Sequence, residues 1–250
     1  MRRTNILLIA LFALSAQSCR DNFEVETPSG RNYQQDVTVL NDFVDINKNM
    51  YEYYINPNQH NSPLAYVTHS DTEELHAVNP LNLDMFKESM ERVNSLTKEA
   101  SLYQSVDYIV MMTSRQIYIN KIKQDSPIEF KQAISNGHQA PVKTSIDVTG
   151  DIAQQAFYEN YNYVQTSIHL NPQAYHNIGW VFYINCETRK GNTEETARIL
   201  FCGIGYYNNP CFDWKWIDQP YNTATEWNFT ITSGLTDSNF AIAKVNFLQP

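Results

Sequence analysis

The sequence predicts an α+β protein in which a helical N-terminal part is followed by a mainly antiparallel β-sandwich or partly closed barrel. Two observations predict this class. Apolar residues recur at helical spacing in the first hundred residues, and they alternate with polar residues from about residue 141 onward. The 250-residue chain can bury a sizeable core in one or two domains. We therefore expect a mainly helical region over residues 32–140 and a β-rich domain over residues 141–250.

The first 18 residues have the pattern of an export signal. Arg2 and Arg3 precede an apolar run over residues 6–14, nine residues without a charge. This run has the length of a signal core, whereas a membrane-spanning helix needs about 20 apolar residues. Ala16 and Ser18 then place small residues at positions −3 and −1 relative to Cys19.

This arrangement resembles the lipobox of bacterial lipoproteins. The resemblance implies removal of residues 1–18, a diacylglycerol thioether on Cys19, and acylation of the new amino terminus with a fatty acid such as palmitate. Residue 20 is Arg rather than the Asp of inner-membrane retention signals, so an outer-membrane anchor is implied. An ordinary secretory signal that contains a cysteine is the alternative. No family is identified for residues 20–250.

Residues 19–31 predict a lipidated, flexible tether, because Pro28, Ser29 and Gly30 interrupt any regular structure. Three acidic residues in this segment look like the acidic tether of surface-displayed lipoproteins in some Gram-negative groups: Asp21, Glu24 and Glu26.

Two helices are expected next. The first follows a stripe with steps of three, four and seven residues: Tyr33, Val37, Leu40, Val44, Tyr51 and Ile55. The second has a capping Asn79, Pro80 in its first turn, and the stripe Leu83, Phe86, Met90, Val93 and Leu96. Residues 56–78 between them predict a loop.

Within residues 104–123, apolar residues recur at every second position, first at Val106, Tyr108, Val110 and Met112 and then at Ile117 and Ile119, which predicts a hairpin. Ser126, Pro127 and Glu129 then have the spacing of a capping box, which predicts a short helix that stops near Asn136 and Gly137.

From about residue 141 the pattern predicts five to seven short strands separated by turns, one of which holds Gly191 and Asn192. The alternating residues that define them are Ile146 and Val148; Val164, Thr166 and Ile168; Trp180, Phe182 and Ile184; residues 199–207; Trp227, Phe229 and Ile231; and Ala241, Ala243, Val245 and Phe247.

Composition excludes some partners. Removal of the signal takes two Arg and no acid from the 18 basic and 27 acidic residues, which leaves 16 against 27, a net charge of −11. Nucleic-acid binding needs a basic footprint, so we expect no nucleic-acid partner. Only 18% of residues are charged, so Asn, Gln, Ser and Thr must supply much of the polar surface, which suits neutral ligands. Eight Gly and no glycine-rich phosphate loop predict no cofactor.

Three cysteines remain if Cys19 carries lipid. Cys202 and Cys211 bracket an eight-residue loop and are a candidate disulfide pair in an oxidising envelope, while Cys186 is an alternative partner for either. None lies in a CxxC arrangement, which argues against a zinc site built from cysteines.

No catalytic residue can be assigned from a motif. The metal-type ligands His60, His69, Asp71 and His76 match no known spacing, so we predict ordinary loop side chains and no metal site. A nucleophile elbow is absent, and a glycosidase carboxylate pair is not recognisable from sequence.

The densest unusual stretch covers residues 206–216 and is rich in aromatic residues. One interpretation is a strand that lays Phe212, Trp214 and Trp216 on the core. The functional interpretation is a binding surface at a loop rim, where flat rings and an amide contact a sugar ring or a protein partner. Its candidate residues are Tyr206, Tyr207, Asn208, Trp214 and Trp216. A third interpretation is an aromatic belt at a membrane interface.

The resulting hypothesis is an envelope-anchored, surface-displayed lipoprotein that acts as a non-catalytic binding or adhesion module for glycan or protein. It would contact the membrane through its N-terminal lipid. A membrane-active β-sandwich protein and an envelope hydrolase are the alternatives.

Overall fold

The computed structural model of the chain describes residues 32–58, 70–103, 105–133, 144–149, 153–158, 163–170, 179–190, 193–205, 211–216, 226–233 and 241–248. The predicted signal, the tether and Cys19 lie outside these residues. Side chains are described at positions 32–58, 70–99, 105–129, 179–185, 187 and 196–205.

The described residues form three helices and thirteen strands. The helices are α1 (Tyr33–Asp42), α2 (Thr72–His76) and α3 (Pro80–Tyr103). The strands are β1 (Val44–Asn47), β2 (Glu52–Ile55), β3 (Tyr108–Met112), β4 (Ile117–Lys121), β5 (Ile128–Ala133), β6 (Thr144–Thr149), β7 (Ala153–Tyr158), β8 (Tyr163–Leu170), β9 (Gly179–Lys190), β10 (Thr193–Ile204), β11 (Cys211–Trp216), β12 (Glu226–Ser233) and β13 (Ala241–Leu248).

The strands form one hairpin sheet and two larger sheets. β1 pairs with β2, a six-stranded sheet has the order β4-β3-β10-β9-β12-β7, and a five-stranded sheet has the order β5-β11-β8-β13-β6. All described pairings are antiparallel except β3 with β10, which is parallel. Each order has two edge strands, so neither sheet closes on itself within the described chain. The predicted α+β class is confirmed.

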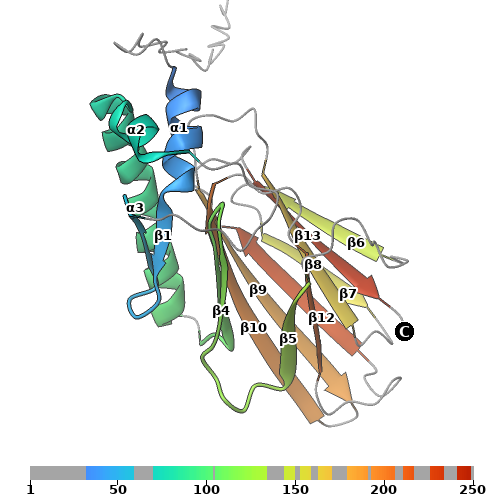
Figure 1. The fold of residues 1–250 in the computed structure, drawn as a ribbon. Helices are drawn as coiled ribbons and strands as arrows, with labels where there is room; N and C mark the ends of the chain where they lie inside the picture. The colour runs from blue at the N-terminus through green and yellow to red at the C-terminus, as the bar shows by residue number, and fades with distance from the viewer. Residues whose placement is uncertain are drawn as a thin grey trace, which may run out of the picture.

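The helices lie together on one side of the sheets (Figure 1). α3 contacts β9 and β10, and α1 contacts α3. Alternate residues of β10, namely Leu200, Cys202 and Ile204, join the core cluster beneath this helical layer. The apolar cluster therefore attaches the helices to the six-stranded sheet.

The opposite face of the six-stranded sheet is also buried. Trp180 and Phe182 of β9 are fully buried with their ring centroids 5.7 Å apart, and Phe201 of β10 is fully buried as well. β9 and β12 contact β13 and β6 of the five-stranded sheet.

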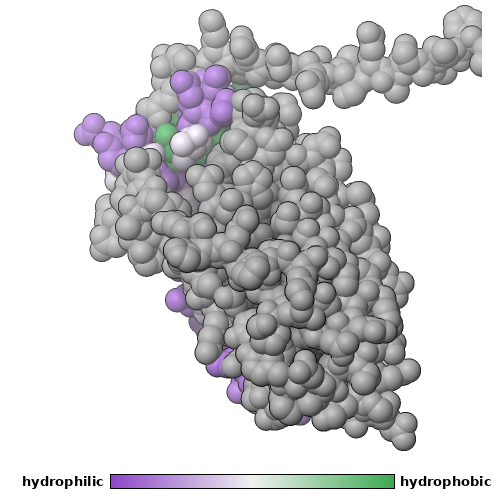
Figure 2. All heavy atoms as spheres, turned by 90° about the vertical axis from the view of Figure 1, so that its right-hand side faces the viewer, coloured by the Kyte–Doolittle hydropathy of each residue, from purple (hydrophilic) through white to green (hydrophobic). Residues whose placement is uncertain are grey.

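Viewed from the side of β6 and β13, the described residues that reach the surface are mostly hydrophilic (Figure 2).

Several predicted elements are confirmed. α3 begins at Pro80, the Asn79 side chain accepts a hydrogen bond from Leu81 N at 2.9 Å, and Phe86 and Val93 of the predicted stripe are fully buried. β3 and β4 form the predicted hairpin. The later alternating segments are strands β6, β8, β9, β10, β12 and β13. The predicted turn at 191–192 lies outside the described residues, although its neighbours Lys190 and Thr193 pair directly.

The predicted helix over residues 33–55 is wrong beyond Asp42. A capping box between Asn32 and Gln35 starts α1, and the chain then turns into the β1–β2 hairpin. β1 alternates buried Val44 and Ile46 with half-buried Asp45 and Asn47, so the apolar positions also satisfy strand spacing. The predicted loop over residues 56–78 contains α2, which begins at a capping box of Asp71 and Glu74.

The predicted helix after Ser126 is also wrong, because residues 128–133 form β5. The Ser126 hydroxyl accepts from Ile128 N at 3.4 Å, and β5 then pairs with β11 along its length. Within the described residues the last helix ends at Tyr103, and β3, β4 and β5 follow inside the region 32–140 that was expected to be mainly helical. β7 is an additional strand.

Cys202 has a free thiol in the structure, which corrects its predicted pairing with Cys211. Its side chain lies beneath the helical layer and donates to Val110 O at 3.5 Å, whereas Cys211 begins a strand of the other large sheet. Complete burial raises the pKa of the Cys202 thiol to about 11. The side chains of Cys186 and Cys211 are not among those that the structure describes.

Candidate functional site

A groove of about 860 Å³ lies between α3, β2 and the end of α2. Its inner lining is apolar and consists of buried or half-buried residues: Tyr53, Ile55, Leu75, Leu83 and Met90. The rest of its lining is polar or charged: Glu52, Tyr54, His76, Lys87, Glu91, Asn94, Ser95 and Lys98. Both the size and the combination of an apolar lining with a few polar groups are typical of ligand sites.

One stripe of α3 forms the helical wall of this groove. Leu83, Lys87, Met90, Asn94 and Lys98 follow one another at steps of three or four residues, so they lie on one side of the helix. The same helix buries Phe86 and Val93 in the core. α3 therefore both packs the helical layer onto the six-stranded sheet and forms one wall of the groove.

The strand wall of the groove is β2, and Tyr53 holds it at three points. Tyr53 N donates to Asn94 Oδ1 at 2.7 Å, and Asn94 Nδ2 donates to Tyr53 O at 3.0 Å. The Tyr53 hydroxyl accepts from Met112 N at 3.1 Å. These bonds tie β2 both to α3 and to the six-stranded sheet, so the two walls keep a defined separation.

Asp45 orients the exposed ring of Tyr54. The Tyr54 hydroxyl and Asn56 Nδ2 donate to Asp45 Oδ2 at 3.1 and 2.9 Å, Ile46 N donates to Asp45 Oδ1 at 2.7 Å, and Gln116 Nε2 also donates to Oδ1. Burial opposes ionisation of Asp45, but these hydrogen bonds outweigh it and lower its pKa. Burial and the charge of Asp45 raise the pKa of Tyr54, so the phenol stays a hydrogen-bond donor.

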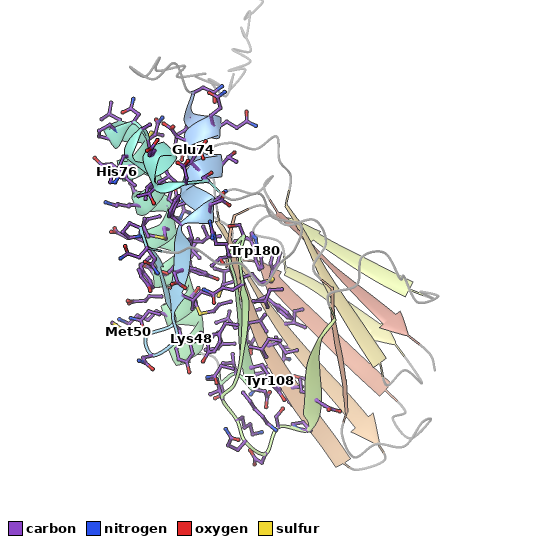
Figure 3. All side chains as sticks on the ribbon, viewed as in Figure 1. Lys48, Met50, Glu74, His76, Tyr108 and Trp180 are labelled. Atoms are coloured by element: carbon purple, nitrogen blue, oxygen red, sulfur yellow. The ribbon has the colours of Figure 1, made fainter. Side chains whose placement is uncertain are left out.

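Charges of both signs line the groove. Within the described residues no ion pair involves Glu52, His76, Lys87 or Glu91. His76 projects from the helical layer on the side away from the sheets (Figure 3). Charged groups are therefore available to a ligand along the opening.

The predicted aromatic site is only partly described. Tyr206, Tyr207 and Asn208 lie outside the described residues. Trp214 and Trp216 belong to β11, an inner strand between β5 and β8; Trp214 lies opposite residues of both strands, and Trp216 lies opposite Ile128 of β5. This site stays a prediction.

Of the four metal-type residues of the sequence, the structure describes Asp71 and His76. Asp71 caps α2 and accepts from Glu74 N at 2.8 Å, His76 lines the groove, and His60 and His69 lie outside the described residues. Among the described side chains no three metal-binding groups come together. No described helix is both long enough and apolar enough to cross a membrane.

Sequence reasoning missed the groove because it placed β2 in a helix and α2 in a loop. One usable signal was the polar part of the α3 stripe. Lys87, Asn94 and Lys98 recur at helical spacing next to the apolar stripe. Such a polar stripe beside an apolar one indicates a helix face at the boundary between core and solvent, where a groove can form.

Comparison with known proteins gives no family for this chain. No family model matches it, and no curated protein matches it. Among solved structures, it is similar to the structure of TmCBM61 in complex with beta-1,4-galactotriose, with 12% identity over 50% of this chain and 83% of that chain. The TM-score of 0.24 is too low to indicate a shared fold.

Proposed function

We propose that this chain is an envelope-anchored, surface-displayed binding module that holds a glycan or a protein segment in the groove between α3 and β2. It acts without catalysis, and the two larger sheets stack as a β-sandwich that supports the helical layer. The lipobox resemblance at Cys19 supports an outer-membrane lipid anchor.

The observation that carries this proposal is the make-up of the groove. An apolar lining of Tyr53, Ile55 and Met90 lies beside charged groups that no described ion pair neutralises, including Lys87 and Glu91. Such charges remain hydrated until a partner replaces the water, so they are available for recognition. Hydrogen bonds already hold Tyr53 and Tyr54 in place, so these side chains lose little conformational entropy when a ligand binds.

The binding groove can be tested with matched variants of α3. The full chain carrying Cys19→Ser would be titrated against an array of host and microbial polysaccharides and against a random peptide library. We expect a saturable ligand whose affinity falls at least tenfold in Glu91→Ala and in Lys87→Ala, because each removes a charge-assisted contact worth about 1.5–3 kcal/mol.

Glu88→Ala is the control for this experiment. Glu88 is exposed on the same helix, three residues before Glu91, but does not line the groove, so its loss should leave affinity unchanged. Equal effects of Glu88→Ala and Glu91→Ala, or no ligand in either collection, would contradict the proposed site.

The lipid anchor has a separate test. The native chain should partition with the membrane fraction and carry acyl chains on Cys19, while Cys19→Ser should be unlipidated and leave that fraction. Fractionation and mass spectrometry of the N-terminal peptide measure both. Unchanged membrane partition of Cys19→Ser would exclude a lipid anchor at this residue.

A further inference from the structure

We propose that the ligand of the groove is an extended peptide that adds as a strand to the free edge of β2 and pairs with the backbone of Ile55. This inference rests on the proposed function and names the ligand class of the same groove.

The hydrogen-bond register of the hairpin shows which backbone groups of β2 point outward. Asn56 N donates to Phe43 O at 2.7 Å, so the Phe43–Asn56 pair is hydrogen-bonded, and pairs along an antiparallel ladder alternate. Ile55 opposite Val44 and Tyr53 opposite Ile46 are therefore non-hydrogen-bonded pairs. Their N–H and C=O groups point away from β1, toward α3.

The outward groups of Tyr53 show that this edge faces the groove. Both bind the side-chain amide of Asn94, which supplies one acceptor and one donor as a neighbouring strand would. The outward groups of Ile55 bind nothing within the described residues, although Ile55 lines the groove. The outward backbone groups of Tyr53 are thus paired with a side chain, and those of Ile55 are open as far as the described residues go.

An open rung beside an apolar groove favours a peptide over a sugar. An extended peptide carries N–H and C=O groups at the spacing that pairs with a strand edge, and this is a recurring mode of peptide recognition. A neutral polysaccharide lacks that regular pair. Residue 57 is a proline without an N–H, so pairing centres on Ile55 rather than running further along the chain.

The lining of the groove defines the peptide further. Side chains of a strand alternate between two faces, and Tyr53 and Ile55 pack against the core cluster while Tyr54 is exposed. The peptide residue on the inner face would lie over the apolar lining formed by Leu75, Leu83 and Met90. Its neighbours would face Lys87 and Glu91. We therefore expect an extended segment with one apolar residue flanked by polar or charged residues.

The test starts with a phage-displayed library of random dodecapeptides, selected on the full chain carrying Cys19→Ser. A selected peptide would be synthesised with each backbone nitrogen methylated in turn. Methylation of the nitrogen that pairs with Ile55 O should lower affinity roughly tenfold, while most other positions tolerate it. Equal tolerance of methylation at every position would overturn strand addition.

Protein variants locate the pairing. Ile55→Pro removes the donor at an edge position that accepts proline and should weaken the same peptide roughly tenfold, while Ile55→Val keeps the donor and should bind as the native chain does. Circular dichroism checks that the proline variant is folded, and the methylation series needs no protein variant. A methylation-sensitive peptide that binds folded Ile55→Pro as well as the native chain would overturn pairing at this edge.

The two proposals fail differently. Glu91-dependent binding of a polysaccharide, with no peptide enriched, would overturn the peptide inference and leave the groove as a binding site. Absence of any Glu91-dependent ligand would overturn both.

Discussion

At the scale of single residues, Gly203 shows how closely the core is packed. It lies in β10, opposite Trp180 of β9, and a Cβ atom at this position would overlap the indole ring of Trp180. Trp180 is fully buried beside Phe182. The ring cannot move outward without leaving its contacts, so the strand pair requires a residue without a side chain here.

Gly203→Ala should therefore lower the free energy of unfolding by about 1–3 kcal/mol, the usual cost of overpacking a core. Urea denaturation measures this loss. Trp180→Phe removes the ring atoms that the new methyl group meets, so the penalty of Gly203→Ala should shrink in that background. An unchanged penalty would mean that the clash does not lie at Trp180.

Residue-scale prediction succeeded where the cause is local. α3 begins at Pro80 because the Asn79 side-chain oxygen accepts from a free N–H of the first turn, and because proline has no N–H that would need a partner there. Both effects are local and do not depend on what the helix packs against. The state of Cys202 could not be predicted this way. Its distance from Cys211 along the chain is short, but the two residues lie in strands of different sheets.

At the scale of elements, the strength of the local pattern decides what could be predicted. α3 has a capping Asn79 at its N-terminus and a sustained apolar stripe, and β9 and β10 have long alternation. The β1–β2 hairpin matches a helix in sequence because Val44, Tyr51 and Ile55 recur at helical spacing. The turn that separates them depends on Asn47, which accepts from Asn49 N and Met50 N, and on Tyr51 at φ 54°.

The short β5 strand illustrates the limit of local signals. Ser126, Pro127 and Glu129 have the spacing of a helix start, yet the segment pairs with β11, whose Trp214 lies opposite Phe130. That partner is more than eighty residues away in the chain. Tertiary pairing overrides a local helix signal here, and no short window of sequence contains the reason.

At the scale of the whole molecule, strands that are far apart in the sequence pair in one sheet. β3 pairs in parallel with β10, so the segment that follows the helices is part of the same sheet as strands after residue 178. The predicted aromatic site came from one continuous stretch, residues 206–216. The groove instead combines β2, the end of α2 and one stripe of α3. Sites assembled from distant segments require the fold before they can be recognised.

The central claim is that ligands bind between α3 and β2, and amide hydrogen exchange of the full chain carrying Cys19→Ser tests it most directly. Exchange would be measured by mass spectrometry with and without a selected ligand at saturating concentration. We predict slower exchange in residues 52–55 and 87–98, with residues 211–216 unchanged. Slower exchange in residues 211–216 with the groove unchanged would contradict the claim and place binding at the aromatic strand.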